Sequence, residues 1–366
     1  MRKNSNKKEV FNYIYSNPGT TKQALQMNLN LSLPTINSCV SQLMADNLII
    51  HSGMEKNTGG RNSKEYSINQ KLRYSIGIDI TKNHISVVLI NLSSEIVDYL
   101  RVKHKFSNTE SYFLQLRELI KTILDKNKVE LNNVLECGIG LPALTNITND
   151  KVVYGEILGI KSLEVKEIEN YLGLPCKLYN DANAAGFGET WNYPPDNTTF
   201  YLMLSNNVGG CILSQGEPYY GNTLKSGEVG HLRLHSDGKQ CYCGQKGCVD
   251  QYLSSKQLSR FTDGNLEAFF DELPENQEFQ TIFDAYIIDL VETLNAIRMV
   301  LDCDIILGGY VGSHLEPYLH TIQEKLDQRN SFGDKSDYIF LCNQRKESIA
   351  VGAALPSILS FIEDIY

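Results

Sequence analysis

Residues 227–231 read GEVGH and residues 241–250 read CYCGQKGCVD, and together they are the most specific part of the chain. One histidine and three cysteines fall within 18 residues. Imidazole and thiolate are typical ligands of tetrahedral zinc, and four protein ligands leave no position for water, so the pattern predicts a structural zinc site. Unligated core thiols are the alternative, but they have no reason to cluster with a histidine and with turn-forming glycines, Gly244 and Gly247. The predicted zinc ligands are His231, Cys241, Cys243 and Cys248.

The remaining composition indicates a cytoplasmic protein. Nine cysteines are an odd number, which in a reducing compartment favours metal ligation over a disulfide framework. The longest apolar runs, such as residues 87–90, are far shorter than the roughly 20 residues of a membrane span. The basic amino terminus precedes an amphipathic stretch rather than the apolar segment of a signal peptide. We therefore expect no membrane contact.

Charge is distributed unevenly along the 366 residues, a length that predicts two or three domains. Residues 1–70 carry eight lysines or arginines and four acids, a formal charge of +4. Because the whole chain carries −9, the remaining residues carry −13. A small basic module on a large acidic body suggests that only the first part meets a polyanion.

Residues 1–70 have the pattern of a winged helix-turn-helix. Three short segments with helical apolar spacing precede two strands, at 48–51 and 64–68, which the glycine-containing loop 53–63 joins. In the third helix Ser32 is a candidate N-cap, and Pro34 is tolerated in the first turn. The free polar face of that helix suits the major groove, and a glycine-flanked arginine on the wing suits a narrow minor groove. The expected DNA contacts are Thr35, Asn37, Ser38, Ser41 and Arg61.

A three-helix protein-interaction domain is the alternative for this segment. Helix order, wing and charge sign agree with one another, however, and such agreement favours double-stranded DNA as the partner.

The rest of the chain is predicted to be an α/β body. Strands are expected at 74–80, 84–90, 95–102, 136–141, 176–179, 199–204, 210–213 and 304–307, with helices near 111–125, 181–190 and 279–301. Antiparallel strands followed by alternating strands and helices, twice, suggest two lobes with a cleft between them. We expect residues 1–70 to form the winged helix-turn-helix domain, called the reader domain below because it would read the DNA. Residues 71–182 plus 350–366 are expected to form a small lobe, and residues 183–349 a large lobe with the zinc site.

A second motif, Asn180-Asp181-Ala182-Asn183-Ala184-Ala185-Gly186, joins the zinc segment. With both motifs, and over essentially its whole length, the sequence resembles the ROK family of repressors and sugar kinases. The resemblance implies a two-lobed sugar-kinase-like body of the actin and hexokinase type, here with the winged helix of the repressor branch. It also implies that sugar hydroxyls are held by Asn180, Asp181, Glu228, His231 and Asp250, the last standing where glutamate is more usual.

The side-chain chemistry favours sugar binding independently of the resemblance. Each carboxylate or amide group can bind more than one sugar hydroxyl, so a cluster of them can hold a sugar ring. His231 would place one ring nitrogen on zinc and turn the other toward the sugar. Singly, each of these residues is more often a loop or cap residue.

The phosphate-binding glycines of the related kinases are replaced. Their Asp-x-Gly-Gly-Thr loop is Asp79-Ile80-Thr81-Lys82-Asn83 here, their glycine-rich second loop begins Ser205-Asn206-Asn207, and their third glycine run reads Gly308-Gly309-Tyr310. Each added side chain opposes close backbone approach by phosphates. We therefore predict no enzyme activity, although Asp181 occupies the position of the kinases' base.

These observations predict a sugar-responsive transcriptional regulator, most simply a repressor of carbohydrate-utilisation genes. Its effector would be a sugar or sugar phosphate, and it would act as a homodimer or a dimer of dimers, since operators mirror protein symmetry. The alternatives are an active ROK-type sugar kinase and a regulator controlled by a protein partner.

Overall fold

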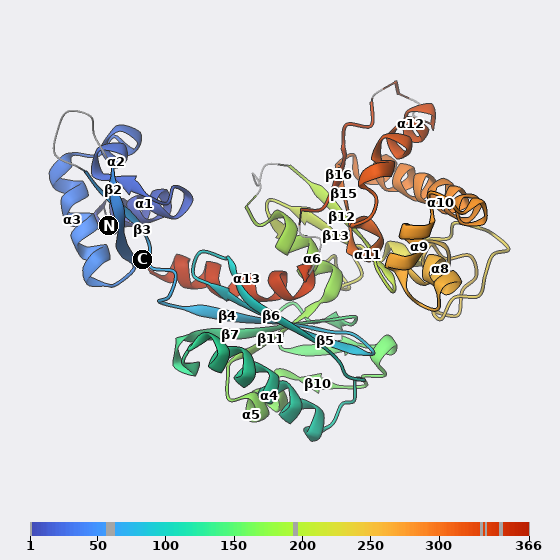
Figure 1. Cartoon of the computed structure of the whole chain (residues 1–366), viewed down its shortest axis with the longest axis horizontal. Coiled ribbons are helices and arrows are strands. Elements are labelled where there is room, and N and C mark those ends of the chain that lie inside the picture. Colours follow the sequence, from blue (N-terminus) through green and yellow to red (C-terminus); the bar gives the residue numbers. More distant parts are fainter. Residues whose placement is uncertain are drawn as a thin grey trace.

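The structure, a computed structural model, describes residues 2–55, 63–192, 197–329, 332–333, 335–343 and 347–365, with the backbone alone for 2–4, 54 and 55. The reader domain, the small lobe and the large lobe lie in different parts of the molecule (Figure 1). A mixed α/β body follows an amino-terminal winged helix-turn-helix, as predicted.

The reader domain packs three helices on a three-stranded sheet of order β1-β3-β2. The side chain of Ser32 accepts a hydrogen bond from the Thr35 amide and begins the third helix, where Pro34 lies in the first turn. Ile36, Val40 and Leu43 are buried on its inner face. The short strand β1 was not predicted, because two residues carry too little periodicity. The elements are α1 (Arg2–Ser16), β1 (Thr20–Thr21), α2 (Lys22–Leu29), α3 (Leu33–Ala45), β2 (Ile49–Glu55) and β3 (Ser63–Ile68).

The small lobe is built on a five-stranded sheet of order β11-β7-β4-β5-β6. Its central strand β4 pairs antiparallel with β5 and parallel with β7. Every residue of β4 is buried, as expected for a strand covered on both faces. The elements are β4 (Tyr74–Ile80), β5 (His84–Asn91), β6 (Ile96–Lys103), α4 (Glu110–Asn127), β7 (Val134–Leu141), β8 (Leu144–Thr145), β9 (Lys151–Tyr154), β10 (Leu163–Glu164), α5 (Val165–Leu172) and β11 (Cys176–Asn180).

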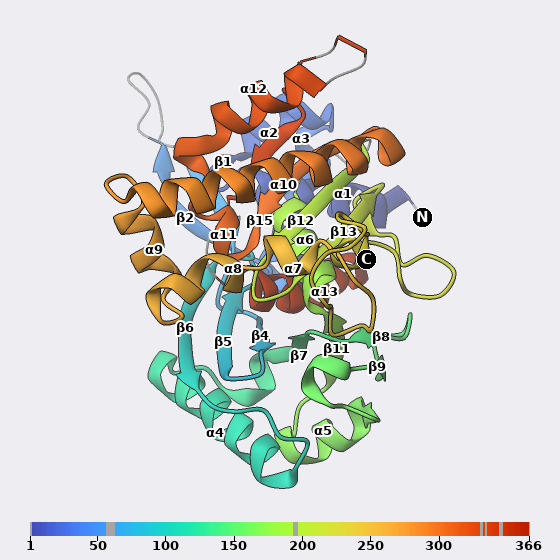
Figure 2. The same cartoon turned by 90° about the vertical axis from the view of Figure 1, so that its right-hand side faces the viewer.

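The large lobe is built on a second five-stranded sheet, of order β14-β13-β12-β15-β16. Helix α10 crosses this lobe (Figure 2), and its apolar side packs into the lobe's core. The elements are β12 (Thr199–Leu204), β13 (Val208–Ser214), β14 (Glu217–Pro218), α7 (Asp250–Leu253), α8 (Lys256–Ser259), α9 (Leu266–Glu272), α10 (Gln277–Leu301), β15 (Asp304–Gly308), α11 (Gly309–Gly312), α12 (Leu319–Arg329) and β16 (Ile339–Leu341).

Two helices, α6 (Asp181–Thr190) and α13 (Ser348–Asp364), lie between the sheets. Figure 1 shows α13 running from the middle of the molecule toward the reader domain, with the carboxyl terminus beside it. Its apolar residues Ile358 and Ile362 share one buried cluster with the reader residues Phe11 and Ile14. The reader domain is therefore packed on the body and not merely tethered to it.

Among the described residues, no helix is both long and apolar enough to span a lipid bilayer.

Candidate ligand-binding cleft and metal centre

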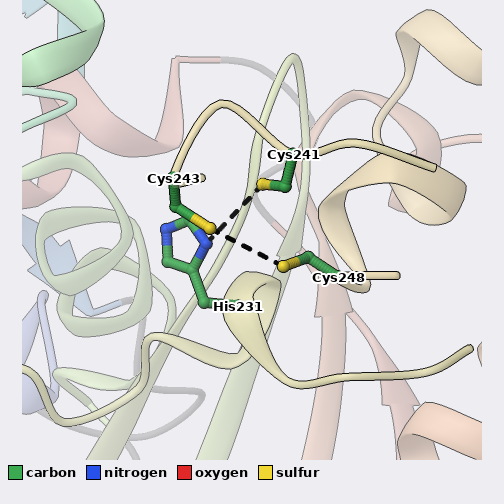
Figure 3. A group of neighbouring side chains, drawn as sticks. All are labelled: His231, Cys241, Cys243 and Cys248. Atoms are coloured by element: carbon green, nitrogen blue, oxygen red, sulfur yellow. Dashed lines mark hydrogen bonds between the residues drawn. The ribbon is translucent and has the colours of Figure 1, made fainter. Parts of the chain in front are cut away.

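The predicted zinc ligands come together at one point (Figure 3). One ligand atom from each of His231, Cys241, Cys243 and Cys248 lies within 4.8 Å of the others. The Sγ atoms of Cys243 and Cys248 are 3.7 Å apart, and Cys241 Sγ is 4.0 Å from His231 Nδ1. The donor set and its spacing fit a metal ion held by four protein ligands, which leaves no coordination position for water.

The loop that carries these ligands turns at the two glycines that the sequence indicated. Gly244 has φ +86° and Gly247 has φ +75°, the left-handed region that favours glycine. At Gly247 a side chain would also overlap the His235 carbonyl oxygen. Cys241 and Cys248 are thereby held at 3% and 1% exposure, whereas Cys243 is reachable from solvent.

A cavity of about 630 Å³ lies beside the metal centre. Four of the five residues expected to hold sugar line it, together with residues from both lobes. Those four are Asn180, Asp181, Glu228 and His231.

Asp181 and Asn180 stand where β11 meets α6. One carboxylate oxygen of Asp181 accepts a hydrogen bond from the Ala182 amide at 2.9 Å. Burial, with a smaller contribution from the nearby carboxylate of Glu228, raises the pKa of Asp181 to about 6, although the hydrogen bond from the Ala182 amide lowers it. The side chain of Asn180 caps α6 through the Asn183 amide and donates to the Ala143 carbonyl at 3.2 Å, so it holds the turn in place.

His231 joins the metal centre to the cavity. Its Nδ1 atom faces the cysteines, while its Nε2 atom lies 3.9 Å from Glu228 Oε2 and 3.5 Å from the Tyr242 hydroxyl. Burial raises the pKa of Glu228. One imidazole ring can therefore bind a metal through one nitrogen and orient cavity side chains through the other.

Asp250 differs from the sequence-based expectation, because it is absent from the cavity lining. It is 3% exposed, and its Oδ1 atom accepts a hydrogen bond from the Val208 amide at 2.7 Å. Its Oδ2 atom accepts from Gln251 at 3.2 Å. Because Asp250 is the first residue of α7, its side chain, which is shorter than glutamate, reaches the Val208 amide at the end of the β12–β13 turn.

A second cavity, of about 510 Å³, adjoins the first, and Met203 lines both. Inside it Arg101 of β6 donates a hydrogen bond to the Tyr310 hydroxyl at 3.1 Å and lies over the Tyr310 ring at 5.6 Å. The Tyr310 amide donates to Ser205 at 3.3 Å. Asp79 lines the cavity at 6% exposure, and its Oδ1 atom has no hydrogen-bond partner among the described residues.

Sequence reasoning missed several lining residues of the first cavity. Val153, Tyr154 and Ile157 come from a short hairpin and the following turn, which have no motif of their own. Lys225 also lines this cavity. The β8–β9 pairing that brings this segment over the cavity has no periodic signal in the sequence.

The predicted DNA contacts of α3 lie on its open face. Asn37, Ser38 and Ser41 are exposed, whereas Thr35 is half-buried and pairs with the Ser32 hydroxyl at 2.8 Å. Lys22 on α2 donates to Asn37 Oδ1 at 2.7 Å, which was not foreseen. Arg61 and the loop residues 56–62 lie outside the described residues.

Comparison with known proteins agrees with this arrangement. The profile of the ROK family matches residues 75–356, and that of the winged helix-turn-helix DNA-binding family matches residues 3–50. The xylose repressor of Bacillus spizizenii is 26% identical over 335 residues, which cover 90% of this chain and 83% of the repressor. The glucokinase of Halalkalibacterium halodurans is 26% identical over 204 residues, covering 53% of this chain and 61% of the kinase.

Solved structures show the same fold. A ROK family transcriptional regulator, described as a homologue of the E. coli MLC protein, superposes with a TM-score of 0.72 at 17% identity and 99% coverage of both chains. A ROK family glucokinase from Streptomyces griseus, in complex with glucose and AMPPNP, superposes with a TM-score of 0.63 at 21% identity, over 77% of this chain and 98% of the kinase.

A winged helix-turn-helix fused to a sugar-kinase-like body defines a class of DNA-binding regulators. The chain belongs to the ROK family, because the family profile spans most of its length.

Proposed function

We propose that this protein is a sugar-responsive transcriptional repressor. The observation that carries the proposal is the cleft, where the carboxylates of Asp181 and Glu228 and the imidazole of His231 line one cavity. The amino terminus of the same chain matches a DNA-binding family. Similarity to xylose repressors over most of the chain supports the same function and makes a pentose such as xylose the first effector to test.

Hydroxyl recognition follows from the side chains at the floor of the cavity. Asp181 and Glu228 offer acceptor oxygens, and His231 Nε2 lies beside Glu228. Carboxylates in a partly desolvated site make strong hydrogen bonds to hydroxyl groups, and an analogue lacking a hydroxyl leaves them unpaired. A sugar would bridge α6 on one side and the 228–231 turn on the other.

Two adjacent helices can carry the signal to the reader domain. Asp181 begins α6, and α6 packs closely on α13, where a Cβ atom on Gly352 would overlap the Ala184 carbonyl oxygen. Toward the far end of α13, Ile358 and Ile362 belong to the same buried cluster as the reader residues Phe11 and Ile14. We infer that closure of the cleft moves α6 and α13 and alters the spacing of two readers in a homodimer, so that they no longer match the half-sites.

The second cavity argues against phosphoryl transfer. Glu347 adds an acidic side chain to its lining, and the hydrogen-bonded side chains of Arg101 and Tyr310 line it as well, which opposes close approach of phosphates to the backbone. Phosphoryl transfer depends on positioning the donor and on stabilising its negative charge. We therefore propose that the chain does not use ATP and that Asp181 serves as a hydroxyl acceptor.

The metal is proposed to be zinc, with a structural role. His231, Cys241, Cys243 and Cys248 would hold it, and it would fix the loop that orients His231. A repressor of this kind acts on double-stranded DNA in the cytoplasm.

The deciding experiment follows release of operator DNA by fluorescence anisotropy while sugars are added, with calorimetry of sugar binding to the same protein. We expect the effector sugar to release DNA, with Asp181→Asn and Glu228→Ala losing both binding and release. Asp263→Asn, at an exposed loop position, is the matched control. Unchanged sugar binding in both cleft variants would overturn the assignment, and sugar-dependent turnover of ATP would restore the kinase alternative.

A further inference from the structure

One wall of the sugar cavity is apolar and the opposite floor is polar. The segment 144–157 contributes five lining residues, of which four are aliphatic or aromatic. Val153 and Tyr154 are 46% and 57% exposed although they line a ligand cavity. The polar groups Asp181, Glu228 and His231 come from other elements, at the start of α6 and on the 228–231 turn.

The volume exceeds what a single sugar ring needs. Even if each of its about twelve non-hydrogen atoms took the roughly 30 Å³ that one molecule of liquid water takes, a six-carbon sugar would fill at most about 360 Å³. The cavity measures about 630 Å³, so a comparable volume remains. A second ring would account for most of it.

A sugar ring carries hydroxyls around its rim and C–H groups on its faces, and aliphatic side chains offer the rim no hydrogen bonds. A first ring held through its hydroxyls by the carboxylates leaves room for a second ring to place its C–H face on the Tyr154 ring and on Val153, where burial of apolar surface is favourable. Tyr154 is the last residue of β9 and is 57% exposed, so its ring is open to a ligand, and it belongs to a different element from the carboxylates.

We propose that the effector is a disaccharide, with one ring held by Asp181, Glu228 and His231 and the second ring packed on Tyr154 and Val153. This inference rests on the proposed sugar-sensing function and names the substrate class of the same cavity. Tyr154 is then a specificity-determining residue that selects for the second ring and does not contribute to binding of the first.

The test compares D-xylose with xylobiose, and D-glucose with cellobiose and maltose, by calorimetry on the full-length protein. We expect the best disaccharide to bind about tenfold more tightly than its monosaccharide. Tyr154→Ala should abolish most of that difference, because it should lower disaccharide affinity about tenfold more than monosaccharide affinity. Tyr154→Phe should preserve it, because the ring and not the hydroxyl makes the contact. Tyr219→Ala is the matched control, since Tyr219 is 54% exposed and is absent from the cavity lining.

Two results would overturn the inference while leaving sugar sensing intact. One is equal affinity for monosaccharides and disaccharides, with both lost in Asp181→Asn. The other is loss of disaccharide preference in Tyr154→Phe, which would assign the contact to the hydroxyl. Binding of every sugar unaffected by Asp181→Asn would instead refute the proposed function itself.

Discussion

Asp79 is the residue whose environment departs most from its ordinary chemistry. Burial first, and then the nearby carboxylates of Glu347 and Asp181, raise the pKa of this carboxyl to about 8, against a lowering by Arg101. In the related kinases this position begins a phosphate loop, whereas here it faces a cavity crossed by the Arg101–Tyr310 pair. The folded protein thus holds Asp79 neutral at pH 7.

A neutral Asp79 makes stability depend on pH. The unfolded aspartate has a pKa near 3.9, so between about pH 4 and pH 8 the folded state binds more protons than the unfolded state, and stability falls as pH rises through that range. Asp79→Asn removes the ionisation. We expect its thermal midpoint to exceed that of the wild type at pH 8 and to approach it at pH 5, measured by calorimetry.

Asp263→Asn, at an exposed site, should leave the pH dependence of stability unchanged. If Asp79→Asn followed the wild-type curve across the whole range, Asp79 would have to be ionised in the folded protein.

The metal ligands make a second prediction at the scale of single residues. We expect the purified protein to contain about one zinc per chain and Cys243→Ser to contain far less, measured by elemental analysis. Sugar affinity should fall in the same variant, because His231 loses the metal that fixes its ring. Cys39→Ser in the reader domain is the control and should keep the metal. A wild-type protein that contains no metal, with a melting temperature indifferent to chelator, would contradict the assignment.

Among the elements, α3 presents Asn37, Ser38 and Ser41 away from the reader's core. Lys22 of α2 holds the Asn37 side chain by a hydrogen bond of 2.7 Å, which fixes its direction before DNA binds. A fixed amide can read one base, because its donor and acceptor match adenine in the major groove.

We therefore expect Asn37→Ala to lose preference at one base position of the half-site, at a cost of about 1–3 kcal/mol there. Selection from a randomised operator library, compared with wild type, measures this. Asn28→Ala, an exposed asparagine on α2, should keep the wild-type preference. Uniform loss of affinity on all sequences would show that Asn37 contacts the backbone instead.

The contact between α6 and α13 depends on glycine. A Cβ atom on Gly352 would overlap the Ala184 carbonyl and would lie 3.0 Å from the Gly188 amide nitrogen. Because backbone cannot yield as a flexible side chain does, the helices would have to separate.

Gly352→Ala should lower the free energy of unfolding by about 1–3 kcal/mol, measured in denaturant. Ser360→Ala, at an exposed position on the same helix, should have little effect. A fully stable Gly352→Ala variant would mean that the two helices can shift apart without cost, and the proposed route through them would lose its physical basis.

At the scale of the molecule, reader and body form one packed unit. Tyr15 of α1 and Ser94 of the β5–β6 turn share a hydrogen bond of 2.9 Å between their hydroxyls. The Leu92 amide of the body donates a hydrogen bond to the carbonyl of Gln70, the last residue of the reader domain. A rigid connection of this kind can transmit a rotation, whereas a flexible linker would absorb it.

Ile362 tests that connection. Truncating this buried side chain to alanine should cost about 2–4 kcal/mol of stability and should weaken sugar-induced release of DNA more than it weakens sugar binding. Anisotropy and calorimetry on the same samples separate the two effects. Glu363→Ala, its exposed neighbour, is the control. Undiminished release in a destabilised Ile362→Ala protein would place the signal elsewhere.

Short-range patterns in the sequence were sufficient to predict many of the helices and strands and the cluster of one histidine and three cysteines. The strand 74–80 and the helix from Asp181 to about Thr190 were predicted within their observed bounds, because buried strands and capped helices have strong short-range patterns. The four metal ligands were predicted from spacing alone, and the structure brings them together.

The features that we could not predict from the sequence are side-chain positions that depend on contacts between distant segments of the chain. Asp250 was expected in the cleft, yet the start of α7 turns it toward the Val208 amide. The Arg101–Tyr310 pair joins residues 209 positions apart, and Tyr154 reaches the cavity through a short hairpin without a periodic pattern. Local patterns and motifs were enough to predict the winged helix-turn-helix, the histidine–cysteine cluster and the resemblance to the ROK family, because those signals lie within short stretches of sequence. The direction of each side chain was decided only by tertiary packing, since it depends on which surfaces the folded chain brings together.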